Sequence, residues 1–295
     1  MWQDFDRRRL QRDGVELVWR QGGAGSPLLL MHGHPQTMAM WHRVAPRLAR
    51  QHRVILLDLR GYGDSGRPEP GPGHAAYSKR EMARDALHLM RSLGHERFAL
   101  LAHDRGARVA HRLMLDHPDA VSRAMLLDIA PTLAMYEATS EAFARAYWHW
   151  FFLIQPAPLP ERLIEADPAA YLRESMGRRL AGSDAFAPEA WAEYARCIAR
   201  PGSAQAICSD YRASAGVDLE HDRADRAAGR RLVQPLRVLW GAKGVVARCF
   251  DPLALWQAAA TNVSGRALDC GHYIAEEAPE ALLAEALPFF NEESA

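Results

Sequence analysis

A carboxylate at the junction of a predicted strand and a predicted helix is the feature that most constrains this chain. Residues 97–111 read RFALLAHDRGARVAH, in which an apolar run precedes a short polar turn and then apolar residues at helical spacing. Ala102 and Gly106 are small residues two positions before and after Asp104. Small residues let a strand and a helix pass closely where a strained turn presents its middle side chain. The pattern therefore predicts a nucleophile elbow in which Asp104 is the nucleophile.

The rest of the chain predicts a sheet of βαβ units interrupted by a helical insertion. From residue 26 to residue 131, continuous apolar runs alternate with helical segments, as in a buried parallel sheet. From Thr132 to about Leu232 we find no convincing strand, only helical stretches rich in Ala, Arg and aromatic residues. We therefore expect an α/β fold with a mostly parallel central sheet and an inserted helical cap. The expected divisions are residues 1–131 (first part of the core), 132–232 (cap) and 233–295 (second part of the core).

Three local patterns in the first third of the chain add to this outline. Apolar spacing predicts a helix over residues 41–50. The sequence SKRE at residues 78–81 is a capping box, which predicts the start of a helix that Gly94 ends. Three consecutive arginines at residues 7–9 stand beside several Asp residues, so we interpret them as a solvated face and not as a binding patch.

Composition excludes several classes of partner. The 36 Lys and Arg balance the 36 Asp and Glu, so there is no overall field to attract nucleic acid or a membrane surface, and a charged substrate must be recognised locally. The charged N-terminus lacks the apolar core of a signal peptide, and no run approaches the roughly 18 apolar residues of a membrane span. Scattered cysteines without metal-ligand spacing favour reduced thiols, a cytoplasmic protein and no metal site; they are Cys197, Cys208, Cys249 and Cys270.

His272 and an acidic residue complete a candidate catalytic triad. His272 lies between the last predicted strand and the last predicted helix, and the order nucleophile, acid, histidine is that of the α/β hydrolases. Asp128 ends the strand that follows the nucleophile helix, which is one place for the acid. The other place is the turn WGAKGVV, which has no carboxylate before Asp251. We therefore assign the acid to Asp128, with Asp251 as the alternative.

A carboxylate nucleophile restricts the reaction. Attack on a saturated carbon gives an ester of the enzyme and expels a leaving group, whereas attack on an acyl carbon would give a mixed anhydride with little purpose. Asp104 is already ionised, so His272 has no proton to remove in the first step. Its predicted task is to activate the water that cleaves the ester, while Asp128 holds its tautomer. The backbone N–H groups of Arg105 and His34 are the predicted oxyanion donors.

Two arginines follow the nucleophile at helical spacing. Arg105 and Arg108 stand one and four positions after Asp104, so both can lean toward the elbow. If they only paired with the nucleophile they would stabilise its ground state. They are useful if the substrate is itself an anion that Asp104 would otherwise repel, because a guanidinium can hold a carboxylate with two hydrogen bonds. We therefore predict a carboxylate clamp formed by Arg105 and Arg108, and leave Arg112 as structural.

The chain resembles the fluoroacetate (haloacetate) dehalogenases of the α/β-hydrolase superfamily in both core and cap. The motifs that carry the resemblance are HGHPQ (32–36), HDRGAR (103–108), LDIAPT (127–132), ARAYWHWFFLIQPAP (144–158), SDYRA (209–213) and CGH (270–272). The resemblance implies the roles given above to nucleophile, base, acid and clamp, and it adds a halide pocket formed by His149, Trp150 and Tyr211. It also suggests a homodimer. The chain departs from the family at His34, commonly Phe, and at residues 177–180, which lack an aromatic that often lines the pocket.

The leading hypothesis is the hydrolytic dehalogenation of a short 2-haloacid, such as fluoroacetate or chloroacetate, without a metal or an organic cofactor. The products would be the 2-hydroxyacid, halide and a proton. An epoxide hydrolase would use the same Asp and His chemistry, but it has no reason to carry Arg105 and Arg108. A non-catalytic carboxylate-binding protein would keep both arginines and need neither Asp104 nor His272.

Overall fold

A central sheet organises the protein, whose computed structural model describes residues 1–177 and 185–292. Its eight strands in that part of the chain have the order β1-β2-β4-β3-β5-β6-β7-β8. β2 pairs antiparallel with β1 and β4, and the other pairs are parallel, which confirms the predicted mostly parallel α/β sheet. The strands are β1 (Asp6–Arg12), β2 (Val15–Gly22), β3 (Ser26–Met31), β4 (His52–Leu57), β5 (Phe98–His103), β6 (Val121–Leu127), β7 (Leu236–Gly241) and β8 (Val263–Leu268).

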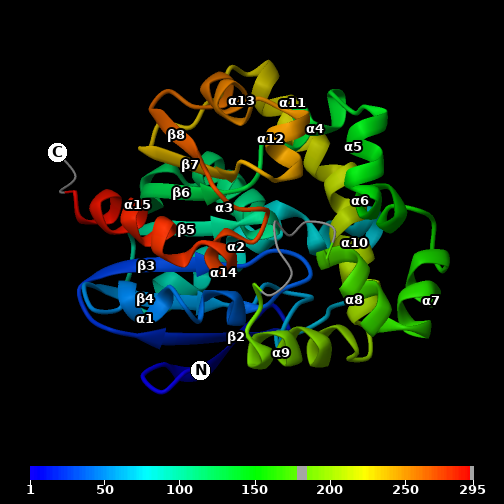
Figure 1. The fold of residues 1–295 in the computed structure, drawn as a ribbon, viewed down its shortest axis with the longest axis horizontal. Coiled ribbons are helices and arrows are strands. Elements are labelled where there is room, and N and C mark those ends of the chain that lie inside the picture. Colours follow the sequence, from blue (N-terminus) through cyan, green and yellow to red (C-terminus); the bar gives the residue numbers. More distant parts are fainter. Residues whose placement is uncertain (178–184, 293–295) are drawn as a thin grey trace.

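Helices that connect or follow the strands cover the sheet. Figure 1 shows α14 and α15 in front of the sheet and α2 and α3 behind it. These helices and short 3₁₀ turns are η1 (Met38–Trp41), α1 (Ala45–Leu48), η2 (Pro72–Tyr77), α2 (Lys79–Ser92), α3 (Asp104–Asp116), η3 (Pro118–Ala120), α12 (Val245–Cys249), α13 (Pro252–Ala259), α14 (Ile274–Glu277) and α15 (Pro279–Asn291).

The described residues between β6 and β7 contain helices and no strand of the sheet. The helices lie beside one end of the sheet, at the right of Figure 1. α9 packs on η1, α10 on η2 and α5 on α12, and each of those partners follows the carboxyl end of a strand. The helices are α4 (Thr132–Glu137), α5 (Glu141–Ala146), α6 (Trp148–Leu153), α7 (Leu159–Ala166), α8 (Pro168–Gly177), α9 (Pro188–Ile198), α10 (Ser203–Ala215) and α11 (Val217–Ala227).

The register of two central strands brings the functional turns together. Met31 at the end of β3 pairs with Ala102 near the end of β5, and the strands are parallel. The turns that begin at His32 and His103 therefore leave the same edge of the sheet, where ligands bind in open α/β folds. Both strands are continuous apolar runs with buried inner residues, because helices cover them on both sides.

The predicted helix over residues 41–50 is wrong in extent. The structure has the 3₁₀ turn η1, which ends at Trp41, and then only one helical turn, α1. Pro46 has no backbone N–H and lies in the first turn of α1, so a single helix cannot run through it from residue 41. The capping box was placed correctly, because the Ser78 Oγ accepts from the N–H of Glu81 at the start of α2.

The N-terminal arginines lie in a strand that the sequence reading missed. β1 forms a hairpin with β2, and most of its residues are exposed, which agrees with the solvated face expected for residues 7–9. The hairpin turn consists of Asp13 and Gly14, both with positive φ. Asp-Gly between two extended segments is a strong signal for a two-residue hairpin turn, and it would have predicted β1.

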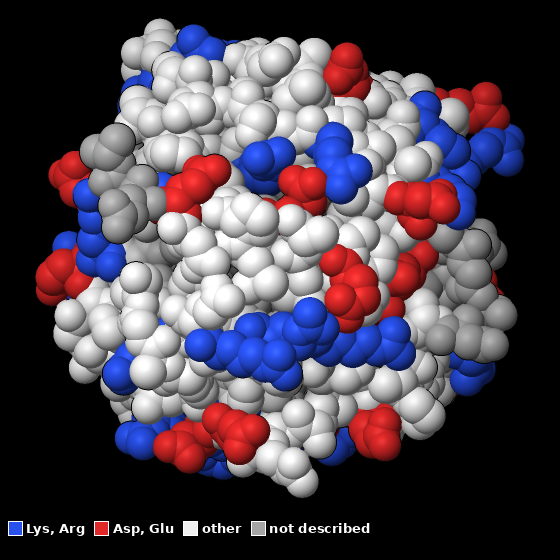
Figure 2. Space-filling model, turned by 60° about the vertical axis from the view of Figure 1, so that its left-hand side comes forward, with Lys and Arg blue, Asp and Glu red and all other residues white. Residues whose placement is uncertain are grey.

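The surface carries charges of both signs. Figure 2 shows one face on which a row of basic side chains is bordered by acidic ones. Among the described residues, no helix combines the length and the apolar character that a membrane crossing requires.

Candidate active site

The predicted strand-to-helix turn lies between β5 and α3. β5 ends at His103 and α3 begins at Asp104, whose φ of 45° is in the left-handed region that few non-glycine residues adopt. A Cβ on Gly106 would lie 2.5 Å from the carbonyl oxygen of His32 and 2.6 Å from that of Met31. The small residue after the turn therefore lets α3 pack directly against the end of β3.

Backbone N–H groups lie beside the Asp104 carboxylate. The N–H of His34 donates to its Oδ1 at 2.8 Å. Asp104 begins α3, so the N–H of Arg105 belongs to the first helical turn, where such groups lack an intrahelical acceptor and favour negative charge. Gly33 makes the approach possible, because a Cβ there would lie 2.7 Å from the same Oδ1. The predicted oxyanion donor at His34 thus contacts the predicted nucleophile, and the one at Arg105 follows the nucleophile directly in the chain.

His272 contacts Asp128, the acid predicted from the sequence. Its Nδ1 lies 2.5 Å from Oδ2 of Asp128, and Oδ1 of Asp128 accepts from the N–H of Gly241 at 2.9 Å. The Nε2 of His272 faces Asp104, 4.0 Å from Oδ2. Asp251 lies elsewhere, where it is exposed and caps α13 by accepting from the N–H of Ala254. The side chain of His272 therefore lies between those of Asp104 and Asp128, and Asp251 is not in contact with them.

A second histidine, His103, packs against His272 and is uncharged. The rings of His103 and His272 lie 4.6 Å apart, and the Nε2 of His103 is 3.0 Å from the backbone oxygen of His272. Burial lowers the pKa of His103 to about 3, so its ring is neutral at ordinary pH. His272 therefore does not face a second positive imidazole when it takes up a proton.

Arg108 is a buried cation without a carboxylate partner among the described residues. Its Nη1 donates to the carbonyl oxygen of Ala130 at 3.2 Å and to Oγ1 of Thr132 at 2.8 Å. Its guanidinium carbon lies 4.7 Å from the ring centre of Trp150. Burial lowers the pKa of Arg108, with Arg105 acting in the same direction and Asp104 opposing it. Among the described residues, an arriving anion would therefore find here a positive charge that no carboxylate holds in an ion pair.

Arg105 is also buried, but a carboxylate already holds two of its nitrogens. Its Nε donates to Oδ2 of Asp210 at 2.8 Å, and its Nη2 donates to Oδ1 at 2.7 Å. Its Nη2 also reaches Oγ of Ser214 at 2.6 Å, and its guanidinium carbon lies 4.1 Å from the ring centre of Tyr211. The clamp prediction did not anticipate Asp210. The only sequence signal was its place in the motif SDYRA, because the contact spans 105 residues.

The three predicted halide-binding residues come from α6 and α10 and lie together. The ring centres of His149 and Tyr211 are 5.9 Å apart, and those of Trp150 and Tyr211 are 6.5 Å apart. All three side chains are buried. The Nε1 of Trp150 has no hydrogen-bond partner among the described residues. Since Tyr211 stacks on Arg105 and Trp150 on Arg108, the aromatic cluster and the predicted clamp form one site.

Of the two departures from the family pattern, His34 lies in the candidate site. The ring of His34 lies near that of His149, with centres 6.1 Å apart, and its Nε2 is 2.9 Å from Oη of Tyr171 on α8. A polar ring at this position therefore contacts another side chain of the helical segment. The stretch 177–180 lies outside the described residues from 178 onward.

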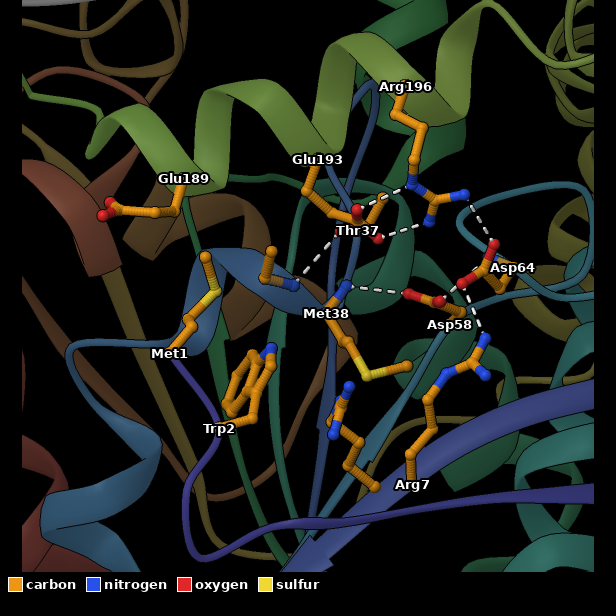
Figure 3. A pocket seen from close by; sticks show the side chains of 12 residues that line it. Met1, Trp2, Arg7, Thr37, Met38, Asp58, Asp64, Glu189, Glu193 and Arg196 are labelled. Atoms are coloured by element: carbon orange, nitrogen blue, oxygen red, sulfur yellow. Dashed lines mark hydrogen bonds and ion pairs between the residues drawn. The ribbon is translucent and has the colours of Figure 1, made fainter.

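A cavity of about 260 Å³ lies apart from the predicted catalytic, clamp and halide-binding residues. Figure 3 shows Asp58 held by the N–H of Met38, and Arg196 reaching Asp64 from α9. None of the predicted site residues lines it. Burial raises the pKa of Asp58 to about 7, although two backbone N–H groups oppose the shift. Within residues 1–177 and 185–292, no three His, Cys, Asp or Glu side chains are grouped to hold a metal ion.

The sequence matches the family described as alpha/beta hydrolase fold over residues 26–279. This chain therefore belongs to the α/β hydrolases.

Two relatives and one solved structure place the chain more closely. It is 43% identical to the fluoroacetate dehalogenase of Burkholderia sp over 281 residues, 95% of this chain and 92% of that protein. It is 34% identical to the soluble epoxide hydrolase of Corynebacterium sp. (strain C12), over 94% of each chain. The crystal structure of ALR0039 from Nostoc sp PCC 7120 superposes with a TM-score of 0.97 at 48% identity, covering 99% of this chain and 100% of that one. The first match confirms the predicted resemblance to the fluoroacetate dehalogenases.

Proposed function

We propose that this protein hydrolyses the carbon–halogen bond of a short 2-haloacid, such as fluoroacetate or chloroacetate, to give the 2-hydroxyacid and halide. The observation that carries the proposal is that Asp104 at the elbow and two buried arginines, Arg105 and Arg108, lie on the same helix. An aspartate nucleophile needs a saturated carbon with a leaving group. Arg108, which has no carboxylate partner among the described residues, favours a substrate that is an anion.

In the first step, one carboxylate oxygen of Asp104 attacks C2 of the haloacid. The carbon–oxygen bond forms as the carbon–halogen bond breaks, and halide leaves with the bonding electrons. Charge-assisted hydrogen bonds from arginine to the substrate carboxylate contribute roughly 1.5 to 3 kcal/mol each, which offsets repulsion between two carboxylates. N–H and O–H groups of His149, Trp150 and Tyr211 receive the departing halide without a fixed opposing charge.

In the second step, water cleaves the ester at the Asp104 carboxyl carbon. The separation of 4.0 Å between Nε2 of His272 and Oδ2 of Asp104 is too long for a direct hydrogen bond and suits a water that lies between imidazole and ester. His272 takes a proton from this water, and Asp128 stabilises the imidazolium. The His34 and Arg105 N–H groups stabilise the oxyanion, which collapses to release the 2-hydroxyacid and the Asp104 carboxylate. The final proton leaves His272 for solvent.

The helical segment supplies the halide donors and closes the site. We propose that residues 132–232 act as a cap, because the donors lie on α6 and α10 while the nucleophile, base and acid lie on the two flanking parts of the chain. Burial of the reacting groups strengthens every electrostatic contact within the site and keeps bulk water from the first step.

The test is to trap the ester in a variant that can form it and cannot hydrolyse it. His272→Ala incubated with chloroacetate should gain the mass of one carboxymethyl group on the intact protein, and peptide mapping should place the adduct on Asp104. The double variant Asp104→Asn, His272→Ala is the matched control and should gain no mass.

Two outcomes would contradict the proposal. Full turnover of chloroacetate and fluoroacetate by Asp104→Asn would exclude the covalent route. An adduct from a neutral epoxide, with none from either haloacid, would instead support an epoxide hydrolase, the activity named for the Corynebacterium relative.

A further inference from the structure

Asp210 occupies the centre of a buried polar cluster that joins the helical segment to the core. It lies on α10 and has no exposed surface. Its carboxylate accepts from Arg105 on α3, from Lys79 at the start of α2 and from the Oη of Tyr62, which lies 2.6 Å from Oδ2. One carboxylate is thus shared by two cations and a phenol from three separate parts of the core.

The contact fixes the plane of the Arg105 guanidinium. Nε and Nη2 form a two-pronged pair with the two oxygens of Asp210, and Nη2 also donates to the backbone oxygen of Asp210 at 3.0 Å. The guanidinium carbon lies over the ring of Tyr211, 4.1 Å from its centre. The two-pronged pair fixes the plane of the guanidinium, and the Tyr211 ring occupies the space beside it. Nη1, the remaining nitrogen, has no acceptor among the described residues, so it is the group left to bind a substrate.

Asp210 keeps the charge that this pairing needs. Burial alone would raise the pKa of its carboxyl, but the charges of Arg105 and Lys79 and their hydrogen bonds lower it well below its ordinary value. Lys79 is itself held, because its backbone N–H donates to Asp218 at 2.8 Å. Asp210 therefore carries its negative charge wherever a haloacid is an anion.

The two arginines of the clamp are consequently unequal. Arg105 is compensated by Asp210, whereas Arg108 has no carboxylate partner among the described residues. Arg108 can supply the net attraction for an anion. Arg105 can supply a directed N–H at a fixed angle, and that angle is set by Asp210.

We infer that Asp210 is a positioning residue that orients Arg105 toward the carboxylate of the substrate, with Ser214, Lys79 and Tyr62 completing its support. The inference rests on the proposed function, because the substrate carboxylate is the group that Nη1 would bind. It assigns part of the substrate specificity to a residue that touches neither the nucleophile nor the reacting carbon.

The test compares an anionic substrate with a neutral one of the same shape. In Asp210→Asn, an amide replaces the carboxylate, so one of the two contacts to Arg105 loses its acceptor. The ratio of kcat/KM for chloroacetate to kcat/KM for chloroacetamide should fall by about tenfold or more, because Arg105 is no longer held at the angle at which Nη1 makes its charge-assisted hydrogen bond to the substrate carboxylate. Most of the change should lie in KM for chloroacetate. An unchanged ratio in the folded variant would overturn the inference.

Asp85 provides a matched control. It is equally buried, pairs with Nε and Nη2 of Arg60 at 2.5 Å each, and is shared with a second cation, Arg12. Asp85→Asn should destabilise the protein as Asp210→Asn does, yet it should leave the substrate ratio unchanged. If both variants lower the ratio equally, the role of Asp210 is only structural.

Two additions keep the test decisive. Should Asp210→Asn fail to fold, Ser214→Ala removes one acceptor from Nη2 and should lower the ratio by about two- to fivefold, whereas no change would overturn the inference. Should the wild type dehalogenate neither compound, the proposed function fails, and calorimetric binding of glycolate and glycolamide decides on Asp210 separately. A loss of affinity for glycolate alone in Asp210→Asn would support the inference. Equal affinities in both proteins, or no preference for glycolate in the wild type, would overturn it.

Discussion

Two acidic residues of the site, Asp104 and Asp128, have backbone conformations that most residues avoid. Their φ values are 45° and 49°, in a region that Asp tolerates better than bulky residues do. Such a conformation costs about 1 to 3 kcal/mol and persists only where neighbouring contacts enforce it. For Asp104 the enforcing contacts are the N–H of His34 and the close approach of Gly33 and Gly106. Close packing and the His34 hydrogen bond therefore hold the nucleophile in a strained conformation.

Replacing Gly33 with alanine should displace the nucleophile and lower the activity. The added Cβ would lie 2.7 Å from Oδ1 of Asp104, so the nucleophile or the oxyanion turn must shift. Because a displacement near 1 Å can cost about a hundredfold in rate, we expect kcat/KM for chloroacetate to fall by at least about that factor. Steady-state kinetics checks this result. Gly177→Ala is the control, since a Cβ there meets no atom of the described residues within 4 Å, and its activity should match the wild type. Wild-type rates in Gly33→Ala would show that the turn has more freedom than these contacts allow.

At the scale of elements, sequence reasoning succeeded where the signal was local. Apolar runs predicted the parallel strands, the capping box predicted the start of α2, and small residues predicted the β5–α3 turn. It failed where the outcome depended on distant partners. β1 exists because β2 pairs with it, and Asp210 reaches Arg105 only when α10 packs across the strand ends. Charge and periodicity alone do not reveal such contacts.

Asp251 should contribute to the stability of α13 and not to catalysis. Asp251 caps this helix through the N–H of Ala254 and does not contact His272. Asp251→Ala should lower the free energy of unfolding by about 1 kcal/mol, as is typical when a helix N-cap is removed, and leave haloacid turnover unchanged. Chemical denaturation and steady-state kinetics measure the two effects. Asp251→Ser keeps a capping oxygen and should recover most of the stability. A strong loss of turnover in Asp251→Ala would make Asp251 the acid after all.

At the scale of the whole molecule, buried polar contacts tie the helical segment to the core. Besides the Asp210 cluster, Glu276 on α14 accepts from the Oη of Tyr194 on α9 at 3.1 Å and from Gln36 in the turn after β3. Glu276 is 1% exposed. Burial raises its pKa to about 8, although both donors oppose the shift. A carboxyl group that is neutral at pH 6 therefore links three regions next to the candidate site.

This group makes the stability of the protein depend on pH in a defined direction. Between its ordinary pKa of 4.5 and about 8, the folded protein holds a proton that the unfolded chain releases, so the free energy of unfolding falls as the pH rises and the loss is complete above about pH 8. Glu276→Gln has no such proton. Relative to the wild type it should gain stability between pH 5 and pH 9, on the order of a few kcal/mol, as measured by denaturation at each pH.

The comparison of wild type and variant isolates this residue, because other buried groups such as Asp58 and Asp218 titrate in both proteins. Glu280→Gln removes an exposed carboxylate on α15 that pairs with Arg47, and its stability curve should run parallel to that of the wild type. If the curve of Glu276→Gln is also parallel, Glu276 is not protonated in the folded state. In that case its contacts to Tyr194 and Gln36 would hold a charge in the wild type, and the link between α9 and the core would be a buried ionic one.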